Sequence, residues 1–277
     1  MVPSLLRIAA AQIDVAFADP AANLARVLAA LDEAAARGAR LVVFPECALT
    51  GYCFANLEEA RAASLSLDGP ELSAIAAACR RHGVVAVVGL VERAAERVNN
   101  TAALLGPGGP IGRYRKCHLP VLGVDRFATP GEGPLEPFDT PVGRLGVGIC
   151  YDGSFPEMSR VLKLRGAQIL LLPTNWPEKA QVSAEFQPIV RAHENHVHFV
   201  AVNRVGTERG FRFVGQSKII DCLGRVLARA GSEGPELLVA DLDPAAADDT
   251  RVVYQKGEYE IDRIGHRRPE LYGPLTE

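Results

Sequence analysis

The sequence of 277 residues predicts an α/β fold in which two β-sheets pack face to face and helices cover both outer faces, a four-layer αββα sandwich. Two observations lead to this prediction. Apolar runs typical of buried strands alternate with helical segments, and several of these segments recur in the same order in the second half. Each half has helices enough to cover one sheet face, so the uncovered faces are expected to pack together. The alternative is a single doubly wound sheet, a fold that does not require the sequence to contain an internal repeat.

The first 92 residues predict three strands separated by two helices. Asp19 supplies a cap and Pro20 a first-turn proline for the first helix, which ends at Gly38. The run "RLVVFPE" is continuously apolar until its end, as in strands buried on both faces. The predicted segments, in order, are a strand at 5–13, a helix between Asp19 and Gly38, a strand at 40–46, a helix at about 70–82 and a strand at 84–92.

Three pairs of segments indicate an internal repeat. "GARLVVFPE" recurs as "GAQILLLPT", "RRHGVVAVVG" as "ENHVHFVAVN", and "TAALLGPGG" as "SKIIDCLGR". We therefore predict a single domain over 1–277 with two similar halves, about 1–140 and 141–265, related by a pseudo-two-fold axis. The tail at 258–277 is too charged and too interrupted by proline to predict an independent element.

Composition and charge restrict the partners. A net charge of −3 and the absence of a basic run with interleaved aromatic residues argue against nucleic acid and anionic membranes. No apolar stretch approaches the roughly 18 residues that span a bilayer, and the start lacks the pattern of a secretory signal. The six cysteines show no spacing typical of a disulfide framework. We therefore expect a cytoplasmic protein with a small-molecule partner.

Three stretches carry residues suited to nucleophilic catalysis. They are Glu46 in "VVFPECALTGY", Lys116 in "GRYRKCHLP" and Cys150 in "LGVGICYDGSFPE". A thiol attacks mainly as the thiolate, so it needs a neighbouring base or cation at neutral pH. If a two-fold axis relates the halves, the strand ends that carry Glu46 and Cys150 converge at one edge of the sandwich. Taken singly, each residue has an ordinary structural explanation: a capping acid, a surface lysine or a core cysteine.

Together, in this order, the three stretches resemble the nitrilase superfamily of carbon–nitrogen hydrolases. The similarity extends over nearly the whole chain, from "AAQIDV" near the start to "RRPELYGPL" near the end. The resemblance implies an αββα sandwich, catalysis by Glu46, Lys116 and Cys150, and no cofactor. It also implies a homodimer in which the C-terminal tail crosses onto a second subunit.

The chemistry that these residue types support is hydrolysis of an amide through a thioester. Attack by Cys150 on the amide carbon puts negative charge on the carbonyl oxygen, which Lys116 and the backbone N–H of Tyr151 are expected to stabilise. Glu46 would take the thiol proton, deliver it to the departing ammonia, and then activate water. The sequence therefore predicts a cysteine-dependent amidase acting on a small linear amide.

Three further residues near the motifs raise separate questions. Many family members carry a second glutamate between the lysine and the cysteine, whereas here the nearest acid before "TPGEGP" is Asp125, one position out of register. Asp125 either takes that role or is a surface turn acid. Cys47 and Cys117 are interpreted as packing residues whose side chains point away from their catalytic neighbours, since adjacent residues of a strand face opposite sides.

The residues after the nucleophile favour amides over nitriles. Nitrile-cleaving relatives usually have Cys-Trp-Glu, whereas amidases and carbamoyl-amide hydrolases more often have Cys-Tyr-Asp, as found from Cys150 onward. An N-carbamoyl amidohydrolase is therefore the alternative, and a nitrilase a weaker one. The resemblance also implies substrate contacts from Tyr52, Asn175 and Trp176, although Trp176 equally suits the core or a dimer contact.

Two other functional classes remain open. His193, His196 and His198 could suggest a zinc hydrolase, but the predicted break between helix and strand near Val197 would separate the third imidazole from the first two. A structural role suffices for these histidines, so we predict no metal site. A catalytically silent scaffold with this fold is the second possibility, and the presence of all three catalytic residue types favours the enzyme.

Overall fold

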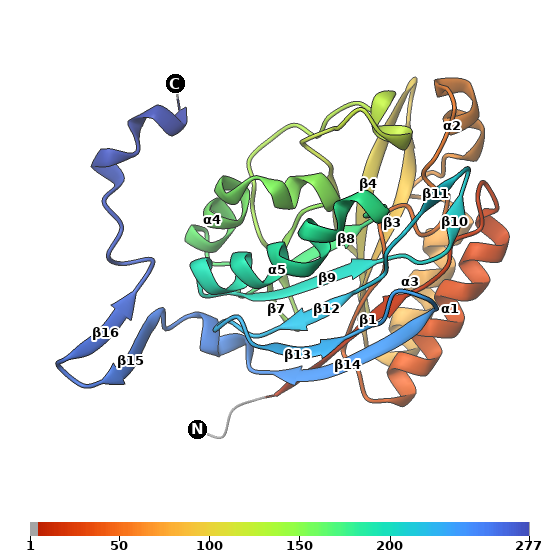
Figure 1. Ribbon diagram of the computed structural model, residues 1–277. Helices are drawn as coiled ribbons and strands as arrows, with labels where there is room; N and C mark the ends of the chain where they lie inside the picture. The colour runs from red at the N-terminus through yellow and green to blue at the C-terminus, as the bar shows by residue number, and fades with distance from the viewer. Residues whose placement is uncertain (1–4, 277) are drawn as a thin grey trace.

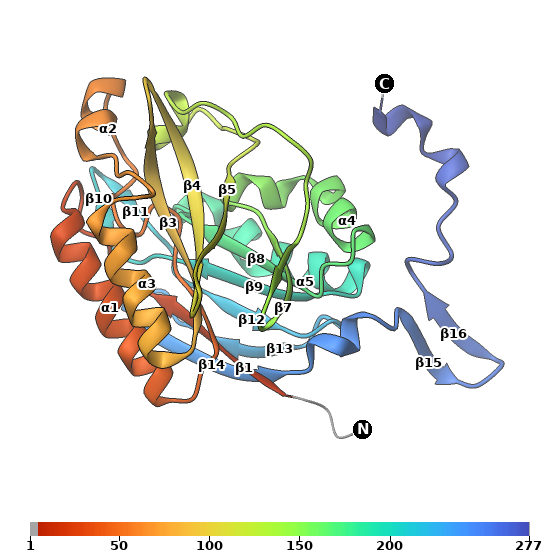
Figure 2. The ribbon, with the colours of Figure 1, turned by 180° about the vertical axis from the view of Figure 1, so that it is seen from behind.

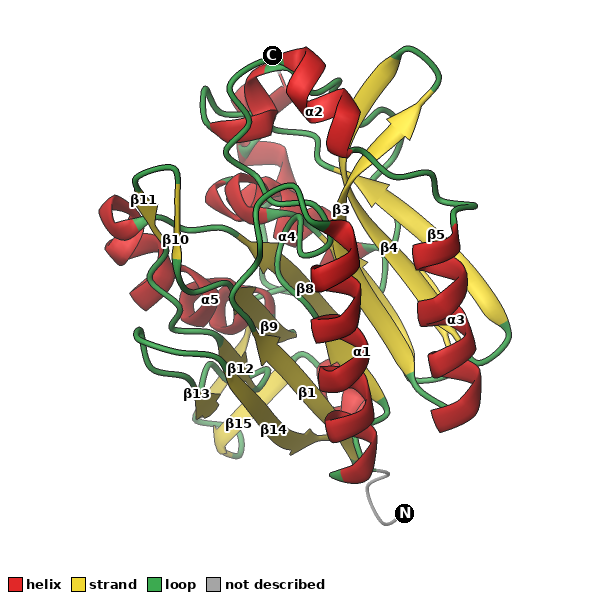
Figure 3. Cartoon of the chain, turned by 90° about the vertical axis from the view of Figure 1, so that its right-hand side faces the viewer, coloured by secondary structure: helices red, strands yellow, loops and turns green. Residues whose placement is uncertain are grey.

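The computed structural model describes residues 5–276 and contains two six-stranded sheets. In the first sheet the strand order is β14-β1-β2-β3-β4-β5, with β1, β2 and β3 parallel and β14, β4 and β5 antiparallel to their neighbours. Its strands are β1 (Leu6–Gln12), β2 (Leu41–Val43), β3 (Val85–Ala94), β4 (Arg97–Gly106), β5 (Gly109–Arg115) and β14 (Glu236–Leu242). Helices α1 (Pro20–Ala36) and α3 (Pro70–His82) lie side by side on its outer face (Figure 3).

The second sheet repeats this pattern with the order β13-β12-β9-β8-β7-β6. Its strands are β6 (Phe138–Thr140), β7 (Gly143–Val147), β8 (Ile169–Thr174), β9 (His198–Asn203), β12 (Lys218–Ile220) and β13 (Val226–Arg229). Helices α4 (Pro156–Leu164) and α5 (Gln181–Asn195) cover its outer face (Figure 1). A hairpin of β10 (Thr207–Glu208) and β11 (Phe211–Arg212) follows β9.

The prediction of an αββα sandwich is confirmed, and the core shows how the layers are held. In β1, Ile8 and Ala10 pack into the cluster between the two sheets, whereas Ala9 and Ala11 pack into a second cluster beneath α1 and α3. All four are fully buried, because successive side chains of a strand point to opposite faces. A strand covered on both sides therefore needs the continuously apolar sequence that β1 has.

The helix boundaries follow the predicted signals. The Asp19 side chain accepts a hydrogen bond from Ala22 N at 3.0 Å at the start of α1. Gly83 ends α3 in the left-handed conformation at φ +66°, which glycine adopts without steric cost. The short helix α2 (Leu57–Ala63), capped by Asn56, was not predicted.

The two halves exchange their edge strands. The repeated segments become β2 and β8, β3 and β9, and β4 and β12, at matching places in the two sheets. However, β6 belongs to the first half of the sequence and pairs with β7, while β14 belongs to the second half and pairs with β1. The boundary near 140 therefore divides the repeat, but it does not divide the two sheets.

The C-terminal segment projects from the body of the molecule (Figures 1 and 2). It contains an antiparallel hairpin of β15 (Arg251–Gln255) and β16 (Tyr259–Asp262), followed by two short 3-10 helices. The only strand within the predicted tail at 258–276, β16, is paired with β15, which lies before the tail. Among residues 5–276, no helix combines the length and apolar composition needed to cross a bilayer.

Candidate active site

Glu46 lies just after β2, at the edge where the predicted site residues were expected. Gly89 of β3 makes room for this segment, because a Cβ atom there would lie 2.4 Å from both Pro45 O and Cys47 N. The Glu46 side chain is buried, with 1% of the residue exposed. A carboxylate without solvent needs partners, and those partners define the site.

Lys116 follows β5 and supplies the central cation. Its Nζ donates to Glu46 Oε1 at 2.7 Å and to Asp125 Oδ2 at 2.5 Å, and all three side chains are shielded from solvent. One ammonium therefore lies between two carboxylates. The structure brings Glu46, Lys116 and Asp125 together, although 70 residues separate Glu46 from Lys116 in the chain.

Asp125 is a buried residue of the site rather than a surface turn acid. It lies in a 3-10 helix at Gly123–Arg126, and 4% of it is exposed. Besides Lys116, it accepts from the Tyr52 hydroxyl at 2.8 Å and from Asn100 Nδ2 at 2.8 Å. This 3-10 turn places the Asp125 side chain at the lysine.

Cys150 occupies a strained turn between β7 and α4. Its φ is +47°, a left-handed conformation that costs free energy for any residue with a Cβ atom. The residue begins a 3-10 helix at Cys150–Ser154 and is 7% exposed. Burial raises the pKa of Cys150, and the backbone N–H of Asn175, after β8, acts in the opposite direction. Cys150 and Asn175 both follow strands of the second sheet, whereas Glu46 and Lys116 follow strands of the first.

Electrostatics in the site favour a protonated thiol and a base beside it. Burial raises the pKa of Cys150 well above its usual value, and the Glu46 charge adds to this effect, although Lys116 opposes it. Burial also raises the pKa of Glu46, against the opposing charge of Lys116. For Lys116 burial alone would lower the pKa, but Glu46, Cys150 and Asp125 together raise it well above its usual value. Lys116 therefore remains a cation.

Several polar atoms are left for a substrate. Glu46 Oε2 is buried without a hydrogen-bond partner among residues 5–276, while Oε1 accepts from Lys116. The side-chain amide of Asn175 is also buried with neither its nitrogen nor its oxygen paired in this part of the chain. Buried polar groups are normally paired, so unpaired ones beside a thiol indicate where another molecule binds.

The other residues predicted to contact the substrate differ in how far they are buried. Tyr52 is 1% exposed, and its ring centre lies 5.9 Å from Lys116 Nζ. Trp176 is 4% exposed and packs into the cluster between the sheets, with its backbone N–H bound to Asn203 Oδ1 at 2.9 Å. The Tyr151 ring is 40% exposed. The role of its backbone N–H at the carbonyl oxygen remains a prediction.

Two features of the site were missed from the sequence. Asn100 of β4 donates to Glu46 Oε1 at 2.7 Å and to Asp125 Oδ1 at 2.8 Å, so one amide orients both carboxylates. Glu208 accepts from the backbone N–H groups of Tyr52 and Cys53 and pairs with the buried Arg204. Neither residue lies in one of the three motifs, since Asn100 precedes the apolar part of β4 and Glu208 lies in β10.

The two cysteines beside catalytic residues differ. Cys117 lines a cavity to which Lys116 does not contribute. Cys47 is fully buried, but its Sγ lies 3.5 Å from Asn100 Oδ1 and therefore faces the site. The prediction that Cys47 points away is wrong, because the chain turns at this residue with φ +49° and does not continue as a strand.

A ring nitrogen of each of the three histidines faces a different backbone carbonyl group. His193 in α5 faces Leu223 O at 2.9 Å, His196 at the end of α5 faces Ala246 O at 3.3 Å, and His198 in β9 faces Asp243 O at 2.8 Å. The helix ends at Asn195, close to the predicted break. Burial lowers the pKa of His196 and of His198, as expected of neutral structural imidazoles.

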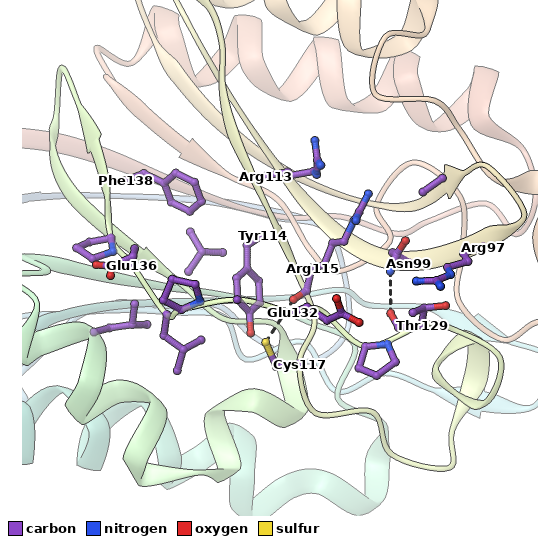
Figure 4. A pocket seen from close by; sticks show the side chains of 18 of the residues that line it. Arg97, Asn99, Arg113, Tyr114, Arg115, Cys117, Thr129, Glu132, Glu136 and Phe138 are labelled. Carbon is purple, nitrogen blue, oxygen red and sulfur yellow. Dashed lines mark hydrogen bonds between the residues drawn. The ribbon is translucent and has the colours of Figure 1, made fainter.

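A cavity lies beside β5, and none of Glu46, Lys116, Asp125 and Cys150 lines it. Its volume is about 890 Å³, and it lies between β5 and the segment at 129–138 (Figure 4). Figure 4 shows Tyr114 and Cys117 next to each other on its wall. Arg113 and Arg115 also line it, and Arg115 pairs with Glu92 at 2.6 Å.

Comparison with known proteins identifies the family. The model of the carbon–nitrogen hydrolase family matches residues 7–252. This chain is a carbon–nitrogen hydrolase. Among its relatives, a nitrilase of Pyrococcus abyssi is 35% identical over 240 residues, covering 86% of this chain and 90% of the relative. An (R)-stereoselective amidase of a Pseudomonas species is 33% identical over 264 residues, covering 94% and 90%.

A solved structure of an amidase has a similar overall fold. A point variant of the amidase from Nesterenkonia sp. AN1, with acrylamide added at its active-site cysteine, has a TM-score of 0.80 and 28% identity. The match covers 98% of this chain and 99% of that one. The carbon–nitrogen hydrolase described here is therefore an enzyme of the nitrilase superfamily, as the three sequence motifs indicated.

Proposed function

We propose that this carbon–nitrogen hydrolase is an amidase that cleaves a small linear carboxamide through a thioester at Cys150 and releases ammonia. The observation that carries the proposal is the buried cluster in which Lys116 bridges Glu46 and Asp125 while Glu46 Oε2 remains unpaired. Such a cluster offers a fixed cation and a free base in the surroundings of one thiol. The amidase relatives support the same reaction class.

The first half of the reaction forms the thioester. Glu46 accepts the thiol proton, Cys150 Sγ bonds to the amide carbon, and the carbonyl oxygen gains negative charge that Lys116 stabilises. The C–N bond then breaks as Glu46 returns the proton to the nitrogen, and ammonia leaves. Because the pKa of the thiol is raised, this transfer to a nearby base is required for attack at neutral pH.

The second half consumes one water. Glu46 removes a proton from water as its oxygen attacks the thioester carbon, and the C–S bond breaks. The proton then passes to the sulfur, which restores the Cys150 thiol and leaves a carboxylic acid product. Asp125 takes part only through Lys116, because its contacts keep the ammonium charged and in place.

Mass spectrometry of the intact protein tests this proposal. The wild-type chain is incubated with ω-amides, N-carbamoyl amino acids, aliphatic amides and nitriles, and ammonia is measured in parallel. We expect an acyl adduct on the peptide that contains Cys150, with ammonia released from at least one amide. Cys150→Ala should show neither, whereas Cys117→Ser should behave as wild type. Absence of adduct and ammonia with every amide would contradict the proposal and favour a silent scaffold.

Nitrile hydrolysis is the second candidate, because the Pyrococcus abyssi relative is named a nitrilase. The same thiol would attack a nitrile carbon, so the residues of the site do not separate the two substrates by themselves. The substrate panel does separate them. Turnover of nitriles with no turnover of any amide would replace the amidase proposal by this one.

We further propose that the enzyme is a homodimer. Three apolar side chains on one face of α5, Val182, Phe186 and Val190, are 74%, 58% and 46% exposed. The projecting C-terminal segment also exposes apolar side chains, including Tyr254 and Leu271. Light scattering should give twice the chain mass, and Phe186→Glu should shift it toward the monomer. A monomeric wild-type protein at working concentration would contradict this proposal.

A further inference from the structure

Lys116 and Cys150 come from different sheets, so their relative position depends on contacts between the sheets. Lys116 follows β5 of the first sheet, and Cys150 follows β7 of the second. No strand pairing joins β5 to β7. A displacement of about 1 Å between reacting groups can lower a rate by about a hundredfold, so some contact has to fix this distance.

Asp152 makes such a contact. Its carboxylate is fully buried and accepts four hydrogen bonds. Oδ1 accepts from His118 N at 3.0 Å and lies 2.7 Å from His118 Nδ1, while Oδ2 accepts from the Tyr114 hydroxyl at 2.9 Å and from Ile149 N at 2.9 Å. The donors thus come from both sides of Lys116 and from the residue before Cys150.

The chemistry of the site requires a carboxylate at this position. All four groups around Asp152 act as donors, and an ionised carboxylate accepts at both oxygens. Because the carboxylate only accepts, the Nδ1 atom of His118 carries the proton. The His118 ring also stacks on Phe155 at 3.8 Å, which ties it to the turn that follows the nucleophile. An amide in place of the carboxylate would turn an N–H group toward one pair of donors.

We propose that Asp152 is a positioning residue that fixes the position of Lys116 relative to Cys150. His118 and Tyr114 are its hydrogen-bond partners. The proposal rests on the proposed function, since the distance between ammonium and thiol matters only if both act on one substrate. Tyr114 also lines the cavity of about 890 Å³, so one donor of this network borders that cavity (Figure 4).

The test compares variants that differ in one donor or acceptor. We expect Asp152→Asn to lower kcat by about a hundredfold while KM changes by less than about threefold. His118→Ala should lower kcat by about tenfold. His118→Asn should recover most of that loss, because its Nδ2 can donate from near the position of Nδ1. The exposed Asp139→Asn serves as the matched control and should have no effect.

A second readout does not require amide turnover. Peptide mapping gives the rate at which iodoacetamide alkylates Cys150, separately from Cys117, and thermal unfolding shows whether each variant is folded. We expect this rate to change at least fivefold in Asp152→Asn and His118→Ala but not in His118→Asn. If wild type cleaves no amide, the proposed function fails while this readout still tests the network. Unchanged kcat and alkylation in folded Asp152→Asn, or equal losses in His118→Asn and His118→Ala, would overturn the proposal.

Discussion

The Asp125 carboxylate lies 2.5 Å from the Lys116 ammonium, which also donates to Glu46 Oε1 at 2.7 Å. Asp125→Asn removes this charge but keeps the size of the side chain. We expect kcat to fall by between about tenfold and a hundredfold, because Lys116 loses one of the two carboxylates that hold it. Asp125→Glu keeps the charge and should retain more activity. Steady-state rates with an amide substrate measure both, and equal activity of Asp125→Asn and wild type would contradict the prediction.

Asn175→Ala should separate binding from stability. The side-chain amide is buried with both polar atoms unpaired within residues 5–276, so the folded protein gains little from it. We expect no loss of thermal stability and a KM about tenfold higher, because a substrate hydrogen bond is removed. Thermal unfolding and substrate titration give the two values. A lower melting temperature with an unchanged KM would show that Asn175 is a structural residue.

Glu208→Gln should destabilise the fold. Glu208 pairs with the fully buried Arg204 and accepts from the backbone N–H groups of Tyr52 and Cys53, so the variant leaves a buried cation short of its partner. Loss of one member of a buried ion pair costs about 3–5 kcal/mol.

The matched control for this variant is Glu233→Gln. Glu233 pairs with Arg212 at 2.8 Å, and the two side chains are 80% and 50% exposed. An exposed pair contributes about 0–1 kcal/mol, so the free energy of unfolding should barely change. Denaturant unfolding of both variants measures the difference. Equal effects of the two changes would refute the structural role assigned to Glu208.

The lowered pKa of Lys218 predicts that the stability of the fold depends on pH. Its ammonium is buried and donates to Ala184 O at 2.6 Å, and burial lowers the pKa of Lys218 to about 8. The unfolded chain therefore binds more protons than the folded one between pH 8 and about 10.4, the usual lysine value. The Lys218 contribution to stability rises with pH across this window and is least favourable below pH 8.

Lys218→Met removes that contribution. We expect the difference in unfolding free energy, wild type minus variant, to increase between pH 8 and about 10.4 and to be flat below pH 8. Urea unfolding at several pH values measures this difference, and subtracting the variant cancels the other groups that titrate there. A difference that stays constant across the window would contradict the lowered pKa.

The fold was largely predictable because its signals are local. The cap at Asp19, the left-handed glycine at Gly83 and the apolar run of β1 each specify an element within a few residues. The exchanged edge strands were not predictable in the same way. β6 has only three residues, and Leu6 pairs with Leu242, so their pairing depends on the whole tertiary structure.

The site was predictable where motifs carry the chemistry. The residue types of Glu46, Lys116 and Cys150 follow from the needs of a thiol nucleophile. Asn100 and Glu208 were missed because their partners are distant in the chain: Asn100 is 54 residues from Glu46, and Glu208 is 156 residues from Tyr52. No local pattern distinguishes such buried polar residues from others until the strands are assembled.

The pairing of β1 with β14 also has a consequence for biosynthesis. Leu6 is synthesised 236 residues before its partner Leu242 (242 − 6), which at about 5–20 residues per second is a delay of roughly 12–47 seconds. During that time the backbone of β1 has no neighbour on one side, and an unpaired strand edge is a template for association with other chains. Nascent chains of this enzyme should therefore depend on chaperones until β14 has been synthesised and has paired with β1.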